Sequence, residues 1–172
     1  LVAIGALFRS DARLVTLVGL GGIGKTRLAV RYARTSGMRT LFCELGDARE
    51  ASSLYQAVAG RLGVTLDGVF DLAAAERIGR ALAEAGPLLL VIDDLDRLGR
   101  SGNAAIGIWL DLAPEVDLLV TSRQPLECPD EHVRLVGPPD APNAAELYIT
   151  RARARGATID DAARPTIADL AE

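Results

Sequence analysis

Residues 13–26 read RLVTLVGLGGIGKT. Residues 13–18 are mostly apolar and β-branched, which by length and composition is typical of a buried strand. Residues 19–26 match G-x-x-x-x-G-K-[ST] in full, the pattern of a loop whose backbone N–H groups surround phosphates. A helical pattern follows at residues 26–35, so the loop has the strand before it and the helix after it that phosphate binding requires. The alternative is a glycine-rich hairpin, or a loop that only begins a helix.

Strand-like and helix-like segments alternate along the rest of the chain. Strands are predicted at residues 40–45, 88–92, 117–121 and 132–136, and helices at residues 52–62, 71–85, 104–112, 141–155 and 161–172. The run LLLVI at residues 88–92 has no polar alternation, as expected for a central parallel strand. This order predicts an α/β fold of three layers, with a mostly parallel five-stranded sheet flanked by helices.

The composition limits the class of protein. The 172 residues carry a net charge of −4, 49% are hydrophobic and 24% are charged, which are ordinary globular values. No apolar run approaches the ~20 residues that a membrane span needs, and the mild acidity gives no reason to expect binding to nucleic acid or to anionic lipid. Two cysteines are too few for a disulfide framework, so a reducing, cytoplasmic setting is expected. Because the chain begins at Leu1 without methionine, we expect the native amino terminus to lie upstream.

The glycine-rich loop supplies the predicted phosphate site. Lys25 is the only lysine in the chain, and its charge would lie on the β- and γ-phosphates of a nucleotide. The hydroxyl of Thr26 would be a ligand for Mg²⁺. The predicted nucleotide-binding residues are Gly19, Leu20, Gly21, Gly22, Ile23, Gly24, Lys25, Thr26 and Arg27.

Two further strands end in polar residues, where ligands bind in open α/β sheets. Asp93 and Asp94 follow the strand at residues 88–92; Asp93 would hold Mg²⁺ and Asp94 would orient the attacking water, unless they only form a polar turn. Arg123 follows the strand at residues 117–121, whose end also carries hydroxyls. Its guanidinium would read the γ-phosphate and so distinguish ATP from ADP, or it is a surface side chain of a loop.

Other residues favour structural roles. His132 is the sole histidine, so no histidine metal cluster or Ser-His-Asp triad is expected, and a surface loop is its predicted place. Asp96 and Arg97 are predicted to form a surface pair. Cys43 is predicted to lie in a buried strand, and Trp109 to anchor the core.

Three segments together resemble the nucleotide-binding core of the signal-transduction ATPases with numerous domains (STAND), close to the NB-ARC group. They are GLGGIGKTRLA, LLLVIDDLDRL and LLVTSRQPL, in that order, and they are similar to the form found in bacterial multidomain transcriptional regulators. The resemblance covers residues 13–172, including HVRLV followed by AAELY. It implies a P-loop NTPase fold that binds ATP or ADP with Mg²⁺, with Thr26 and Asp93 on the metal. The implied catalytic residues are Lys25, Asp94 for the water and Arg123 for the γ-phosphate.

The resemblance also implies a domain organisation. Residues 1–137 would form the P-loop core, with the adenine-side segment before the first strand truncated. Residues 138–172 would be helices leading toward a helical lid that is missing from this sequence. The implied partners are nucleotide and the attached effector and sensor domains, with neither direct nucleic-acid binding nor membrane contact by this domain.

Three functions remain open from the sequence. The first is a regulatory switch that binds ATP or ADP and hydrolyses ATP slowly. The second is an ATP-driven motor or remodelling enzyme with steady turnover, and the third is an interaction scaffold stabilised by nucleotide. A nucleotide-dependent homo-oligomer is a further expected partner. A GTPase is not expected, because the guanine-reading N-K-x-D motif needs a second lysine.

Overall fold

The computed structural model describes residues 1–46, 49–69 and 71–138, together with residues 149, 153 and 156. By its internal contacts the chain divides into two compact units, Leu1–Val136 and Gly137–Glu172. The elements of the first unit, in chain order, are α1 (Val2–Arg9), β1 (Leu14–Val18), α2 (Lys25–Thr35), β2 (Thr40–Glu44), α3 (Ala51–Leu62), α4 (Asp71–Ala85), β3 (Leu88–Asp93), the short 3₁₀ helix η1 (Leu95–Leu98), α5 (Gly99–Leu112), β4 (Val116–Ser122) and β5 (Glu131–Leu135).

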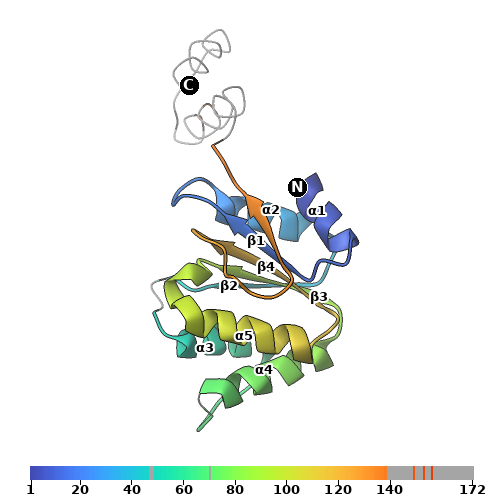
Figure 1. Cartoon of the computed structure of the whole chain (residues 1–172), viewed down its shortest axis with the longest axis vertical. Coiled ribbons are helices and arrows are strands. Elements are labelled where there is room, and N and C mark those ends of the chain that lie inside the picture. Colours follow the sequence, from blue (N-terminus) through green and yellow to red (C-terminus); the bar gives the residue numbers. More distant parts are fainter. Residues whose placement is uncertain (47–48, 70, 139–148, 150–152, 154–155, 157–172) are drawn as a thin grey trace. The chain divides into compact units, whose positions relative to one another are not determined.

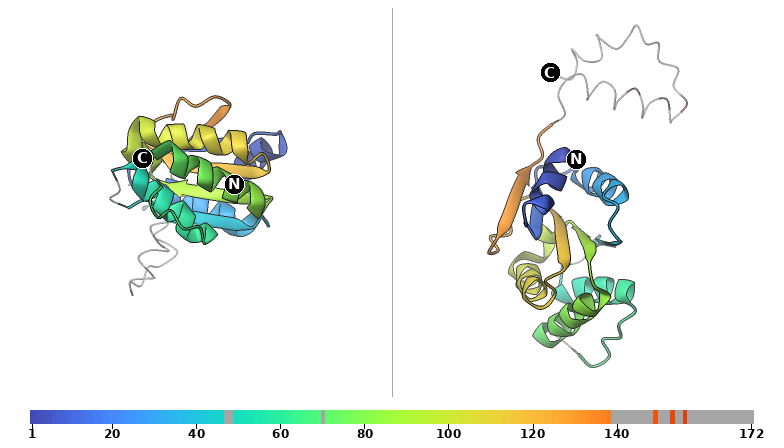
Figure 2. Two further views of the ribbon diagram at one scale, coloured as in Figure 1. Left: turned by 90° about the horizontal axis from the view of Figure 1, so that it is seen from below. Right: turned by 90° about the vertical axis from the view of Figure 1, so that its right-hand side faces the viewer.

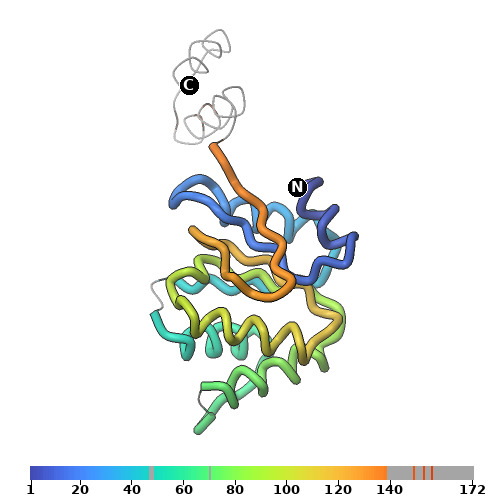
Figure 3. The backbone as a smooth tube through the Cα atoms, in the orientation of Figure 1, coloured from blue at the N-terminus to red at the C-terminus, as the bar shows by residue number. Residues whose placement is uncertain are grey.

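The five strands form one sheet in the order β2-β3-β4-β1-β5, and every neighbouring pair is parallel. Residues 14–18 of β1 pair with residues 118–122 of β4 on one side and with residues 131–135 of β5 on the other. β5 therefore lies beside β1 although the two are far apart in the sequence, as the chain trace shows (Figure 3). Because all strands are parallel, their carboxyl ends meet at one edge of the sheet.

Helices cover both faces of the sheet, which gives the predicted three layers (Figure 1). One face packs against α1 and α2, with Val15, Leu17, Val91 and Leu119 pointing toward them. The opposite face packs against α3, α4 and α5, which lie together on that side in both views of Figure 2. Since β1, β3 and most of β4 are buried on both faces, their sequences show no polar alternation.

The predicted α/β architecture and its parallel sheet are confirmed, and some element bounds differ. α5 begins at Gly99 rather than at residue 104, and η1 was not predicted. α1 lies before β1, in the segment for which the resemblance implies truncation. The predicted helices at residues 141–155 and 161–172 lie outside the described residues, apart from residues 149 and 153. Across the described part of the chain, no helix is both long and apolar enough to cross a membrane.

Candidate functional site

The glycine-rich loop connects β1 to α2 at the carboxyl edge of the sheet. Its last glycine, Gly24, has a φ of 105° and precedes the first residue of α2. L side chains rarely adopt this backbone conformation, so glycine at this position lets the chain turn directly into the helix. The loop is tied to the neighbouring strand because the backbone N–H of Gly19 donates to the carbonyl of Ser122 at the end of β4 (3.3 Å). The amino end of α2 thus faces the strand ends, which favours an anion there.

Lys25 is the first residue of α2 and is only 5% exposed. Its Nζ donates hydrogen bonds to the carbonyl oxygens of Gly19 (2.9 Å) and Leu20 (3.1 Å). A buried ammonium group needs such partners, because removing its charge from water is costly. The structure therefore places the charge of Lys25 against the backbone of the loop itself.

Asp93, the last residue of β3, lies between two hydroxyl groups. The Thr26 hydroxyl donates to its Oδ2 (2.9 Å) and the Thr121 hydroxyl, from the end of β4, donates to its Oδ1 (2.6 Å). Thr26 and Asp93 were predicted to share a metal ion, and their oxygens are indeed adjacent. Mg²⁺ is commonly held by one or two protein oxygens together with phosphate and water, so this pair fits it. Among the described residues there is no group of three or more His, Cys, Asp or Glu side chains that could hold a metal by itself.

Thr121 is a site residue that the sequence analysis did not single out. Its hydroxyl is fully buried, donates to Asp93 and also accepts a hydrogen bond from the backbone N–H of Asp94 (2.9 Å). One hydroxyl therefore fixes both residues of the acidic pair. The available signal was the pair of hydroxyls at the end of an otherwise apolar strand.

Asp94 turns the chain from β3 into η1 with a φ of 61°. Its side chain makes no capping hydrogen bond to η1, and its Oδ2 lies 3.5 Å from a guanidinium nitrogen of Arg97. Asp94 is half-buried, and it follows Asp93 directly at the edge of the sheet. Its predicted role on the attacking water stays a prediction.

Arg123 follows β4 and lies beside the phosphate loop. Its Nη2 is 3.9 Å from the position that a Cβ on Gly21 would occupy. The side chain also faces Asp96, whose Oδ1 accepts the backbone N–H of Arg123 (3.2 Å) and whose Oδ2 lies 3.7 Å from its Nε. The predicted surface pair of Asp96 with Arg97 is therefore wrong: Asp96 faces Arg123, and Arg97 faces Asp94.

Gly19 allows β5 to end close to the phosphate loop. A Cβ at this position would lie 2.5 Å from the carbonyl oxygen of Val136, a distance that real Cβ atoms do not show. The backbone N–H of Val136 in turn donates to the carbonyl of Val18 (2.7 Å). Glycine is thus needed here for a close approach between two backbone segments.

The remaining predicted residues differ in their exposure. Leu20 is 78% exposed, Arg27 is exposed and Ile23 is half-buried.

Cys43 is buried in β2 and Trp109 is buried in α5, where its Nε1 donates to the carbonyl of Ala75 (2.9 Å), so both core assignments are confirmed. His132 lies in the edge strand β5 rather than in a loop, and it is exposed as expected.

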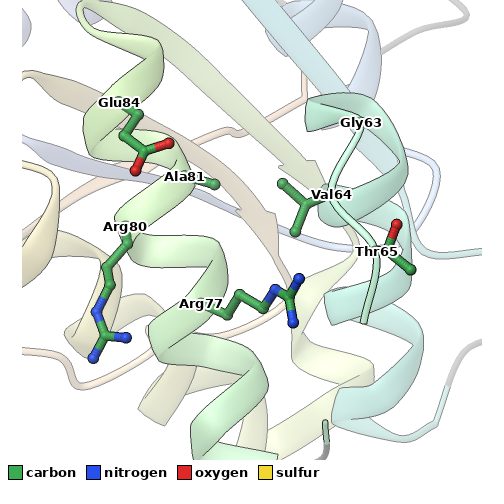
Figure 4. Close-up of a pocket in the computed structure, with 7 residues that line it drawn as sticks. All are labelled: Gly63, Val64, Thr65, Arg77, Arg80, Ala81 and Glu84. Atoms are coloured by element: carbon green, nitrogen blue, oxygen red, sulfur yellow. The ribbon is translucent and has the colours of Figure 1, made fainter. Parts of the chain in front are cut away.

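A separate hollow of about 460 Å³ lies between the end of α3 and α4 (Figure 4). Val64 and Thr65 form one wall, and Arg77 and Arg80 come from α4 on the other side. Arg80 is paired with Glu76 at 3.0 Å on the same helix. None of the residues that line this hollow belongs to the phosphate loop or follows β3 or β4.

The parallel sheet, the glycine-rich loop with Lys25 and the pairing of Thr26 with Asp93 together define a P-loop NTPase domain. Comparison with known protein families agrees, because the model of the AAA domain family matches residues 8–126. The chain therefore belongs to the AAA domain family, and its activity class is that of an AAA-type P-loop ATPase domain.

Curated relatives come from mycobacteria. The "Putative HTH-type transcriptional regulator Rv0890c" of Mycobacterium tuberculosis is 31% identical over 141 residues, which are 81% of this chain and 16% of that protein. An uncharacterized protein of Mycobacterium bovis is 29% identical over 149 residues, covering 84% of this chain and 37% of the relative. The chain thus spans less than half the length of these relatives.

Solved structures share the fold at low identity. Cdc6p from Pyrobaculum aerophilum has a TM-score of 0.64 and 18% identity, over 89% of this chain and 47% of that chain. A STAND protein with a tetratricopeptide repeat sensor from Pyrococcus horikoshii has a TM-score of 0.60 and 16% identity, over 99% of this chain and 27% of that chain. At these identities the similarity shows the fold alone.

Proposed function

We propose that this chain is the ATP/ADP-binding regulatory switch domain of a STAND-type signalling or transcriptional regulator, with slow Mg²⁺-dependent hydrolysis of ATP. The observation that carries the proposal is the position of Arg123, whose guanidinium lies beside Gly21 of the phosphate loop. A cation at the end of the neighbouring strand is suited to contact a γ-phosphate, which ATP has and ADP lacks. The name of the mycobacterial regulator supports the regulatory role.

In this proposal each site residue has one task. The backbone N–H groups of residues 19–24 and the charge of Lys25 bind the phosphates, and Arg27 adds a further positive charge near the loop. Thr26 and Asp93 hold Mg²⁺, which when bound would neutralise charge on the β- and γ-phosphates. Asp94 orients the attacking water, and Arg123 contacts the γ-phosphate, which is present in ATP and absent from ADP.

The proposal also assigns the parts of the chain. Residues 1–137 are the nucleotide-binding core, and residues 138–172 lead toward a helical lid. The effector and sensor regions of a longer regulator would respond to the nucleotide bound here, in the cytoplasm, and nucleotide-dependent self-association would be one form of that response.

A turnover assay tests the switch directly. We expect Mg²⁺-ATP hydrolysis on the order of 10⁻⁴–10⁻² s⁻¹, the range of switch NTPases without an external activator. Turnover near ~10 s⁻¹, the median of ordinary enzymes, would instead identify a motor or remodelling ATPase. A chain that binds neither ATP nor ADP would contradict the proposal.

A further inference from the structure

Asp96 has the surroundings of a functional carboxylate rather than of a surface residue. It lies in η1, two residues after Asp94, and its side chain is only 13% exposed. Its two oxygens face Arg123, one toward the backbone N–H and one toward Nε. Asp96 is therefore fixed in place, whereas the side chain of Arg123 is 63% exposed and freer to move.

The guanidinium of Arg123 faces two different groups. Its Nε side faces the carboxylate of Asp96 at 3.7 Å, and its Nη2 side lies next to Gly21 of the phosphate loop. A planar guanidinium presents donors on both sides but carries one positive charge, so a carboxylate on one side and a phosphate on the other draw on the same charge. The charge of Asp96 therefore acts on the same cation that a γ-phosphate would use.

We propose that Asp96 competes with the γ-phosphate for Arg123 and thereby reduces the preference of the site for ATP over ADP. The inference rests on the proposed function, in which Arg123 reads the γ-phosphate. Asp96 would be a specificity-determining residue that acts through Arg123 and keeps the ADP-bound form accessible.

The geometry decides the direction of this effect. A directional hydrogen bond between nitrogen and oxygen is about 2.7–3.2 Å long, so the 3.7 Å between Nε and Oδ2 is an electrostatic contact without orientation. Asp96 therefore attracts Arg123 without aligning it for a ligand. Its main effect is to neutralise part of the charge that a γ-phosphate would meet, and ADP, which lacks that phosphate, is unaffected.

The experiment measures the affinities of a non-hydrolysable ATP analogue and of ADP, both with Mg²⁺, by calorimetry on the 172-residue chain. The variants are Asp96→Asn, Arg123→Ala and the double variant. Asp96→Asn keeps an oxygen for the Arg123 N–H but removes the charge. Asp11→Asn is the matched control, because it removes one exposed negative charge before β1, at the opposite edge of the sheet, and asparagine tolerates the φ of 65° at that position.

For Asp96→Asn we expect the ratio of ATP-analogue to ADP affinity to rise about two- to fivefold, the range of an exposed ion pair. The ratio should not change in Asp11→Asn, nor when Asp96→Asn is added to Arg123→Ala. Asp96→Glu keeps the negative charge, so its ratio of ATP-analogue to ADP affinity should stay close to that of the wild type.

Other results would overturn the inference. An unchanged or lower ratio in Asp96→Asn, an equal change for both nucleotides, or the same rise in the Arg123→Ala background would each contradict the competition. If Arg123→Ala lowers both affinities equally, the γ-phosphate role in the proposed function fails and this inference fails with it. If Arg123→Ala lowers the ratio of ATP-analogue to ADP affinity while Asp96→Asn leaves that ratio unchanged, only the inference about Asp96 is wrong.

Discussion

Two fully buried threonines on adjacent strands offer a sharp test of the site's hydrogen bonding. Thr121 in β4 donates to Asp93 and accepts from the N–H of Asp94, at 2.6 and 2.9 Å. Thr16 in β1 is equally buried, and its hydroxyl has no hydrogen-bond partner among the described residues. The same substitution, threonine to valine, should therefore have opposite effects at the two positions.

The expected magnitudes follow from the partners. Thr121→Val removes a bond to a charged carboxylate, worth about 1.5–3 kcal/mol, and leaves the Asp94 N–H without its acceptor, which adds about 1 kcal/mol. We expect the free energy of unfolding to fall by about 2–4 kcal/mol. Thr16→Val removes a buried hydroxyl that makes no hydrogen bond to any described residue. We therefore expect the free energy of unfolding to stay the same or to rise by up to about 1 kcal/mol.

Urea denaturation measures both changes, with the slope m checked for constancy. Thr121→Ser is the control, because it keeps the hydroxyl and should lose far less than Thr121→Val. Equal effects of valine at positions 16 and 121, or a Thr121→Val protein as stable as Thr121→Ser, would refute this reasoning.

Three further changes test other parts of the account. Asp93→Ala should abolish the Mg²⁺ dependence of nucleotide binding in calorimetry with and without EDTA, and an unchanged metal dependence would count against its role as a ligand. Gly19→Ala should lower the free energy of unfolding by about 1–3 kcal/mol, because the new Cβ would lie 2.5 Å from the carbonyl oxygen of Val136. Gly21→Ala is the control: its Cβ would have no heavy atom closer than 3.9 Å, so it should lower the free energy of unfolding less. Burial raises the pKa of Asp117 from 3.8 to about 6. Between these two pH values the folded state keeps a proton that the unfolded state has released. The free energy of unfolding should therefore fall as the pH rises from about 4 to about 6. After allowance for solvent screening, this loss of stability is about 1 kcal/mol. Denaturation of the wild type and of Asp117→Asn at pH 4 and at pH 7 measures it, and the Asp117→Asn protein should not show this loss.

The sequence predicts the sheet well because its central strands are buried on both faces. The runs at residues 88–92 and 117–121 are mostly apolar, as expected for parallel strands that lie between two helix layers. The phosphate loop is equally predictable, since its glycines and Lys25 stand in one contiguous segment. The strand order β2-β3-β4-β1-β5 depends on contacts between strands that are distant in the sequence, so no local sequence pattern predicts it.

The start of α5 shows why an element bound was missed. Residues 99–103 read GRSGN, which contains poor helix formers, so the pattern predicts a loop. Tertiary packing overrides this preference: a Cβ on Gly102 would lie 3.0 Å from Leu95 and Leu98, so glycine lets α5 pack tightly on η1. The contact of Asp96 with Arg123 was missed for a related reason, because it joins residues 27 positions apart that meet only after β3 and β4 pair.

The most direct test of the central claim is a calorimetric titration of this chain and of its Lys25→Ala variant with ATP, ADP and GTP in the presence of Mg²⁺. Arg31→Ala is the control, because it removes an exposed positive charge from the same helix, away from the loop. We expect adenine nucleotides to bind in preference to GTP, and Lys25→Ala to weaken that binding at least about tenfold while Arg31→Ala does not. Equal affinities for wild type and Lys25→Ala would contradict the assignment of residues 19–26 as the phosphate-binding loop.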